Sequence, residues 1–159
     1  RLVLREERRA DEIPNEAEQL SWEARIDHRI ALLKRVRGDH QHARAAVERA
    51  IASAAVAGAR CDVARMYALL GWIRWREGDI PGCQDDCRRG LRMCRREVER
   101  DDLWRETVST LLITLGAAYS SACRLVVAER CYRQATRFID ARRSPYQASR
   151  AFNNVATVC

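Results

Sequence analysis

Apolar positions recur along the chain with the period of an α-helix. In the clearest stretch they follow one another at steps of 3, 4, 4, 3 and 4 residues, as Ile80, Cys83, Cys87, Leu91, Cys94 and Val98. Such spacing places them on one face of a helix. No segment alternates apolar and polar side chains long enough to predict a strand. The pattern predicts an all-α fold of about seven helices, at about residues 16–37, 40–57, 61–77, 80–97, 103–121, 124–141 and 146–159.

Glycine followed by aspartate marks the expected ends of two of these helices. Gly38 and Gly78 follow apolar-periodic runs, where a left-handed residue ends a helix. Asp39 and Asp79 come next and can cap the following helix, and Pro81 lies in its first turn. The connections are short, so we expect neighbouring helices to pack antiparallel.

Composition narrows the class of protein. Of 159 residues, 47% are hydrophobic and 32% are charged, which excludes a disordered chain, and 7 glycines and 3 prolines are too few for a turn-rich β-sandwich. No stretch approaches eighteen consecutive apolar residues, so we expect no membrane span. The first twelve residues are strongly charged and contain no signal peptide. Seven cysteines, an odd number at irregular intervals, then favour reduced thiols and a cytoplasmic protein.

A motif recurs at intervals of 40 to 45 residues. The surroundings of Gly38-Asp39 align with those of Gly78-Asp79. The pattern recurs as Leu112-x-x-Leu115-Gly116-x-x-Tyr119 followed by Ala128-x-x-x-Tyr132-x-x-Ala135, and begins again as Phe152-x-x-Val155-Ala156-x-x-Cys159. A fixed period of this length indicates a repeat architecture in which each unit covers the apolar face of the next.

These strings, together with Tyr67-x-x-Leu70-Gly71, resemble tetratricopeptide repeats (TPR), in which small residues lie where two helices touch. The resemblance implies a right-handed α-solenoid, with repeats at about 24–63, 64–108 and 109–148 and a partial repeat at 149–159. Residues 1–23 would be an N-terminal helical segment or the remnant of a preceding repeat. The long period is similar to that of kinesin light chains and of bacterial multidomain signalling regulators. Since the chain stops inside a repeat, we expect a longer parent protein.

In the TPR family the first helix of each pair lines a concave groove that holds peptides. Carried onto this sequence, the resemblance implies a binding groove formed by Arg25, His28, Arg29, Arg65, Trp72, Trp75, Arg76, Arg150 and Asn153, with Leu32, Ala68, Thr110, Ile113, Ala117 and Thr157 between them. Arginines can hold a carboxylate by two hydrogen bonds, tryptophans offer flat apolar area and an asparagine can bond a peptide backbone. Trp72 and Trp75 could equally lie in the core between helices.

Other chemistry has weaker support. Cys83, Cys87 and Cys94 share one helix face and could bind zinc, but core packing already explains their spacing, and His40 and His42 are better explained as an exposed helix start. Phosphate-binding loops and catalytic motifs are absent, so we expect neither enzyme activity, nor a metal, nor a cofactor.

Charge raises one further alternative. The chain has 29 lysines and arginines against 22 acids, a net charge of +7, and Lys34 is its only lysine. A basic face opposite the cysteine stripe could bind nucleic acid or an anionic surface; it consists of Arg88, Arg89, Arg92, Arg95 and Arg96. Self-assembly through the apolar end at residues 152–159 is a third possibility. The preferred hypothesis is a non-enzymatic module that binds an acidic, hydrophobically anchored protein or peptide, or another domain of its parent, within a larger cytosolic bacterial signalling or transcription regulator.

Overall fold

The computed structural model describes residues 15–96, 100–142 and 145–158, and within them every regular element is a helix. The elements are α1 (Glu16–Val36), α2 (His40–Val56), α3 (Arg60–Arg76), α4 (Ile80–Arg95), α5 (Asp102–Ser121), α6 (Leu125–Thr136) and α7 (Pro145–Val158). The all-α class is confirmed. The helices begin and end within two residues of the expected positions except at the end of α6, expected near residue 141. The chain leaves that helix after Thr136, and Phe138 packs edge-on against the ring of Trp104, with ring centres 5.5 Å apart.

Several turns between helices contain a residue with the same left-handed backbone conformation. Gly38 and Gly78 have φ values of 76° and 83°, as expected for residues that end a helix in the left-handed conformation. Gly58 adopts the same conformation at 73°, and Cys123 adopts it at 56° although it is not a glycine. Asp79 then caps α4, because its Oδ1 accepts a 2.9 Å hydrogen bond from the backbone N–H of Gly82.

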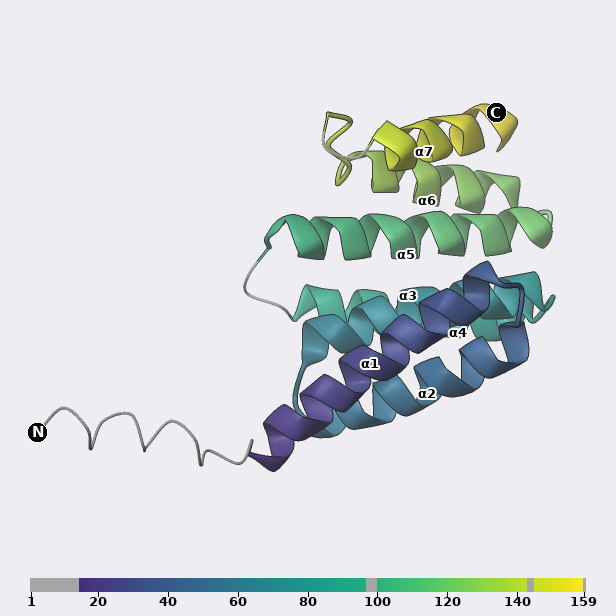
Figure 1. Cartoon of the computed structure of the whole chain (residues 1–159). Coiled ribbons are helices and arrows are strands. Elements are labelled where there is room, and N and C mark those ends of the chain that lie inside the picture. Colours follow the sequence, from purple (N-terminus) through teal and green to yellow (C-terminus); the bar gives the residue numbers. More distant parts are fainter. Residues whose placement is uncertain (1–14, 97–99, 143–144, 159) are drawn as a thin grey trace, which may run out of the picture.

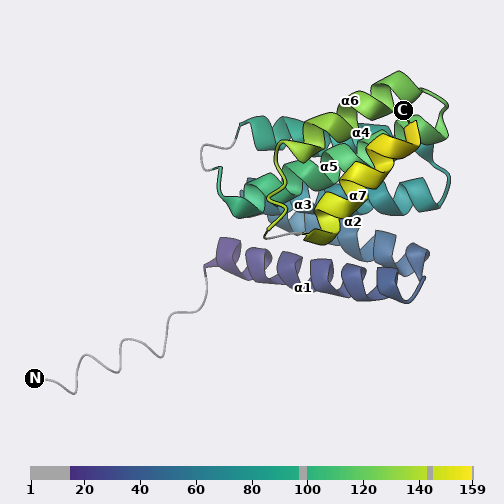
Figure 2. The ribbon, with the colours of Figure 1, turned by 90° about the horizontal axis from the view of Figure 1, so that it is seen from above.

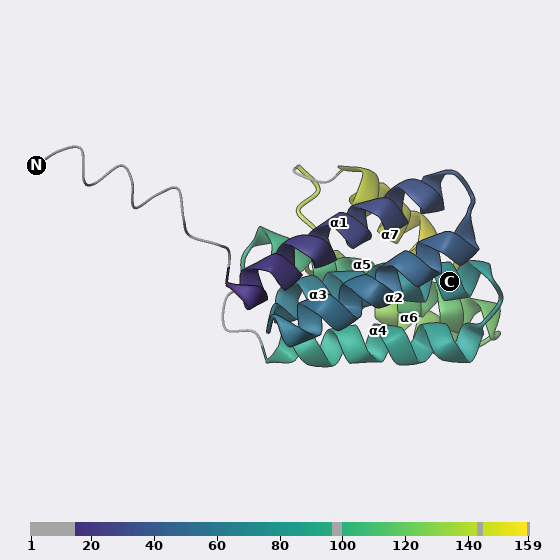
Figure 3. The same cartoon turned by 60° about the horizontal axis from the view of Figure 1, so that its bottom comes forward.

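The helices form antiparallel pairs stacked in a solenoid-like array (Figure 1). The pairs are α1–α2, α3–α4 and α5–α6, and α7 packs against α6. Figure 2 shows α1 at one edge of this stack, and α1 hardly contacts α3, whereas α3 packs against α5. In Figure 3, α1 and α7 lie toward one side of the molecule and α4 and α6 toward the other. The odd-numbered helices thus share one face of the array.

The repeat boundaries expected near residues 24, 64, 109 and 149 fall inside the odd-numbered helices. The pairs begin four to eight residues earlier, at Glu16, Arg60, Asp102 and Pro145. The expected N-terminal segment is therefore divided: residues 1–14 lie outside the described residues, and its remainder belongs to α1.

Close helix contacts explain two glycines inside helices. A Cβ atom on Gly71 would lie 2.9 Å from Cys87 Sγ, and one on Gly116 would lie 2.5 Å from Tyr132 Cε1. We expected a close approach of backbones at these positions, and the nearest neighbours are instead the side chains of Cys87 and Tyr132. The cysteine stripe of α4 is also buried, with Cys83 and Cys87 fully inside the core, while the Val98 that was expected to extend it lies outside the described residues.

Candidate ligand-binding groove

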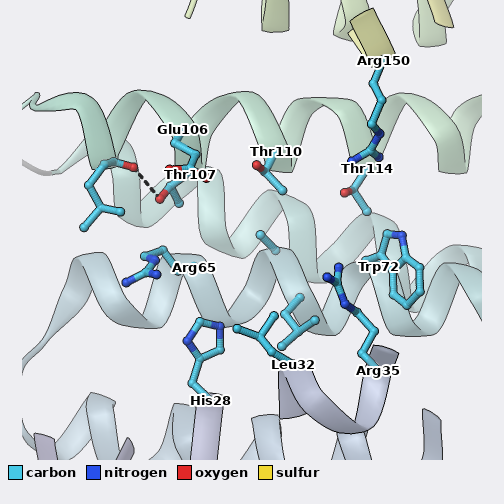
Figure 4. Close-up of a pocket in the computed structure, with 13 residues that line it drawn as sticks. His28, Leu32, Arg35, Arg65, Trp72, Glu106, Thr107, Thr110, Thr114 and Arg150 are labelled. Atoms are coloured by element: carbon cyan, nitrogen blue, oxygen red, sulfur yellow. Dashed lines mark hydrogen bonds between the residues drawn. The ribbon is translucent and has the colours of Figure 1, made fainter. Parts of the chain in front are cut away.

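A groove runs along the face shared by the odd-numbered helices. Its centre is a cavity of about 310 Å³, called here the central pocket, whose walls come from α1, α3, α5 and α7 (Figure 4). The pocket is lined by His28, Leu32, Arg35, Arg65, Ala68, Leu69, Trp72, Leu103, Glu106, Thr107, Thr110, Thr114 and Arg150. A wider cavity of about 670 Å³ continues it between α1 and α3, and a third of about 330 Å³ lies between α3, α5 and α7.

Most of the residues predicted for a groove line these three cavities. Arg25, His28, Arg29, Leu32, Arg65, Ala68, Trp72, Trp75, Thr110, Ile113, Ala117 and Arg150 do so. The helix period placed them on one face of each odd-numbered helix, and the stacking of those helices brings the faces together.

Three predicted residues lie elsewhere. Arg76 is exposed beside the groove, with its guanidinium 5.9 Å and 6.0 Å from the ring centres of Trp72 and Trp75. Asn153 and Thr157 are exposed on α7 and line none of the cavities, and the Thr157 hydroxyl donates a 2.8 Å hydrogen bond to the Asn153 carbonyl. The neighbouring Asn154 lines the third cavity instead. Neighbouring positions on a helix point about 100° apart, so the rotation of α7 about its axis decides that Asn154, and not Asn153, lines the cavity.

The central pocket is positively charged. Arg35, Arg65 and Arg150 reach it from three different helices, and Glu106 is the only carboxylate among the described residues that line it. Figure 4 shows the guanidinium groups of Arg35 and Arg150 pointing toward the same region, beside Trp72 and Thr114. Toward the wider cavity Asp62 balances part of the charge, 3.4 Å from Arg65 Nη1 and 3.7 Å from Arg25 Nε. An anionic group would therefore be attracted to the end of the central pocket near Trp72.

His28 adds a polar group without adding charge at neutral pH. Its pKa is lowered to about 4, chiefly because a buried imidazolium loses its hydration and secondly because the cationic Arg65 lies nearby. The carboxylate of Asp62 opposes this shift only in part. A neutral imidazole has one N–H donor and one acceptor nitrogen, so His28 can bond either kind of ligand atom.

The two groove tryptophans each combine a core contact with a groove contact. Trp72 packs partly against the core formed by α1, α2 and α3, stands edge-on to the His40 ring at 5.7 Å and carries the Arg35 guanidinium 5.0 Å from its ring centre. Trp75 packs partly against the second core, and its Nε1 donates a 3.0 Å hydrogen bond to Ser121 Oγ. Both are half-buried and line cavities. Each of the two tryptophans therefore belongs partly to the core and partly to the groove.

Several lining residues were not predicted from the sequence. Arg35 lies three residues after Leu32 and seven after His28, so the same helical spacing could have found it. Thr107 and Thr114 flank the predicted Thr110 at steps of three and four residues. Leu103 and Glu106 have the same spacing, since they lie seven and four residues before Thr110, so the groove face of α5 could have been extended toward its N-terminus.

Nothing in the described ranges resembles a metal centre or a membrane segment. No three histidine, cysteine or acidic side chains come together there in a way that could hold a metal ion, and no helix of that part of the chain is long and apolar enough to cross a membrane. The pKa of the Cys87 thiol is raised, mainly by a hydrogen bond with Cys83 and secondly by burial. Its neutral form therefore predominates, as in a cysteine that serves core packing.

No protein-family model matches this chain, and no curated protein matches its sequence. The groove is therefore the feature of the molecule that indicates a function.

Proposed function

We propose that the groove binds a protein segment or peptide that carries a carboxylate next to an apolar side chain, and that the chain acts as a non-enzymatic binding module. The observation that carries the proposal is the convergence of Arg35, Arg65 and Arg150 from three helices on a cavity that also contains Trp72. Guanidinium groups hold carboxylates by paired, charge-assisted hydrogen bonds. The ring of Trp72 and the side chain of Leu32 offer apolar contacts within the same pocket.

The shape of the groove favours a chain-like ligand over a compact one. Three cavities follow one another across the odd-numbered helices, and each is open to solvent. Threonine side chains from α5 lie along the central pocket. The hydroxyl of the partly exposed Thr110 can bond a peptide backbone as a donor or an acceptor, whereas Thr107 is buried and its hydroxyl donates to the Leu103 carbonyl at 2.8 Å. A ligand that crosses several helices would use the apolar and polar positions in turn.

The wider setting rests on resemblance. We take the chain to be a tetratricopeptide-type array within a larger cytosolic bacterial signalling or transcription regulator, whose ligand is a separate protein or another domain of the same chain. Five cysteines of the described region are free thiols, which supports a reducing compartment such as the cytoplasm.

Nucleic-acid binding through the outer arginines of α4 is the weaker alternative. Arg88 is half-buried, and its guanidinium donates to the Tyr119 hydroxyl at 2.9 Å and to Asp85 at 3.1 Å. Arg89, Arg92, Arg95 and Arg96 are exposed. The expected basic face of five arginines thus keeps four exposed side chains. None of the four lines a cavity, so this face lacks the combination of converging arginines and an apolar contact that the central pocket offers.

A peptide titration tests the proposal. Isothermal titration calorimetry would compare a library of acidic peptides containing one aromatic or aliphatic anchor with the same peptides carrying Asn for Asp and Gln for Glu. Arg35→Gln should weaken binding of the acidic peptides by roughly 10- to 100-fold, the value of a charge-assisted hydrogen bond. Arg105→Gln is the matched control, because Arg105 is exposed on α5 and lines none of the cavities.

Two results would contradict the groove account. One is equal affinity for the acidic and the neutralised peptides. The other is stronger binding of DNA or RNA, with a steep salt dependence that Arg92→Glu and Arg96→Glu remove and Arg35→Gln does not.

A further inference from the structure

The outward face of α1 is apolar and uncovered. Trp22, Ile26 and Leu33 are 61%, 56% and 62% exposed. With Ile30 and Val36 they form a continuous line, called here the α1 stripe, at steps of four, four, three and three residues. Its spacing places it opposite Ala24 and Ala31, which are buried and belong to the core shared with α2. The helix is therefore apolar on two opposite faces, and only one of them is covered within the described residues.

The next repeat shows what covers the equivalent face of α3. Forty residues later, Ile26, Ile30 and Leu33 correspond to Met66, Leu70 and Ile73 of α3, which are 1%, 3% and 0% exposed. Those three side chains share one core with Ala46, Val47 and Ala50 of α2. The equivalent face of α3 is thus covered by the antiparallel helix α2. The middle of the α1 stripe is likewise aliphatic, so it is suited to an antiparallel helix.

We propose that a second copy of this chain supplies that helix, with α1 packed antiparallel against α1 of its partner across a two-fold axis near residues 29 and 30. A two-fold interface requires a surface that complements itself. The α1 stripe meets this condition: in the antiparallel arrangement Ile26 of one copy lies opposite Leu33 of the other, and Trp22 lies opposite the segment that contains Val36.

Charges beside the α1 stripe complement each other in the same arrangement. Glu23 and Arg37 lie on one flank, about equally far from the middle of the α1 stripe, so each faces the other residue type of the second copy. Within the described residues neither makes an ion pair, and the contact of Glu23 is a 3.2 Å hydrogen bond from Gln19 Nε2. Arg29 lies between Leu33 and Val36 around the helix, and the axis brings the Arg29 side chains of the two copies near each other. Their long stems allow the two guanidinium groups to diverge into water.

The area is sufficient for a reversible dimer. From their exposed fractions, the five side chains present roughly 500 Å² of apolar surface, which equals the largest patches of typical monomers. Two copies, together with their flanking charged side chains, would bury about 1,200 Å², the lower end of specific interfaces. We therefore expect association in the micromolar range. Leu33 and Arg29 also line the wider cavity, so the dimer borders that end of the groove, whereas no residue of the α1 stripe lines the central pocket.

Sedimentation of the whole 159-residue chain over a wide concentration range tests the dimer. The wild type should shift from monomer to dimer as the concentration rises. Ile26→Asp should remain monomeric at the highest concentration used, with the circular dichroism of the wild type. Phe152→Asp is the matched control, because Phe152 is 59% exposed on α7 at the other end of the stack, and it should dimerise as the wild type does.

Charge exchange identifies the geometry. Glu23→Arg alone and Arg37→Glu alone each place like charges opposite one another in a two-fold dimer and should weaken association at least tenfold. An equimolar mixture of the two variants restores both ion pairs, so it should dimerise as well as the wild type. A wild type that stays monomeric, a dimer lost in Phe152→Asp but kept in Ile26→Asp, or a mixture no better than its components would each overturn the proposal.

Discussion

Replacing Gly116 with alanine tests the close packing on which each helix pair depends. Gly116 lies in the middle of α5, where it faces Tyr132 of α6. An added Cβ would stand 2.5 Å, 2.8 Å and 3.0 Å from Cε1, Cδ1 and Cζ of that ring. Tyr132 is only 3% exposed and borders the third cavity, so its ring could give way only by turning toward that cavity. The two helices must therefore separate, or the ring must leave its preferred rotamer.

Two effects of opposite sign determine the result. Alanine is favoured over glycine inside a helix by about 1 kcal/mol. Forcing one extra methyl group into a packed interior costs typically 1–3 kcal/mol, and with three ring atoms at or below 3.0 Å we take the upper value of about 3 kcal/mol. Gly116→Ala should thus lower the free energy of unfolding by about 2 kcal/mol. In a chain of this size that corresponds to a fall in Tm of roughly 4–8 °C.

Thermal and urea unfolding followed by circular dichroism would measure the loss. The matched control is a double-mutant cycle with Tyr132→Leu, which removes the ring edge that meets the new Cβ. In that background Gly116→Ala should change stability by less than about 0.5 kcal/mol, or raise it, since only the helix preference remains. If Gly116→Ala leaves the wild type as stable as before, the close contact does not explain the glycine and the reasoning is refuted.

Three further predictions concern a turn, a histidine and a buried acid. Cys123→Gly should stabilise the chain by up to about 1 kcal/mol in urea unfolding, because Cys123 holds φ at 56°, whereas Gly78→Ala at an equivalent turn should destabilise it by a similar amount. The pKa of His28 is lowered to about 4 from 6.5, so the stability of the wild type should fall as pH drops from about 6.5 to about 4. His28→Gln should reduce this dependence of stability on pH. An unchanged dependence would show that His28 does not cause it. Burial raises the pKa of Asp86, whose carboxylate lies 3.0 Å from Arg74 Nε. Asp86→Ala leaves Arg74 without this partner and should lower the free energy of unfolding by roughly 3 kcal/mol, whereas Asp86→Asn should lower it less. Equal losses of the two variants in thermal unfolding would contradict this.

Local chemistry made most of the fold predictable. Gly38 and Gly78 end helices because their backbone conformation costs glycine little, and Asp39 and Asp79 cap the next helices with side chains only three residues from the N–H they bond. The early end of α6 was not predictable, because no glycine or proline follows Thr136 until Pro145. The contact that accompanies the turn is that of Phe138 with Trp104, which lies more than thirty residues earlier in the chain.

The groove was also predictable where local spacing places its residues, and not where contacts between distant helices do. Helical spacing correctly grouped His28 with Leu32 on α1, and Trp72 with Trp75 on α3, since each group belongs to one element. Spacing within one helix carries no information about the rotation of α7 against α5. Asn154, and not Asn153, therefore lines the cavity.

The arginine excess shows why charge alone could not identify the site. Many arginines are used within the fold: Arg49 pairs with Asp27 at 2.7 Å, and Arg74 pairs with Asp86 at 3.0 Å. The arginines of the central pocket differ from these only in where the stacking of helices places them. Arg35 and Arg150 are 115 residues apart in sequence, and they face one cavity because α1 and α7 border the same face of the array. A net charge of +7 counts both groups alike, so it is the convergence of a few arginines beside Trp72, and not the total charge, that supports an acidic ligand.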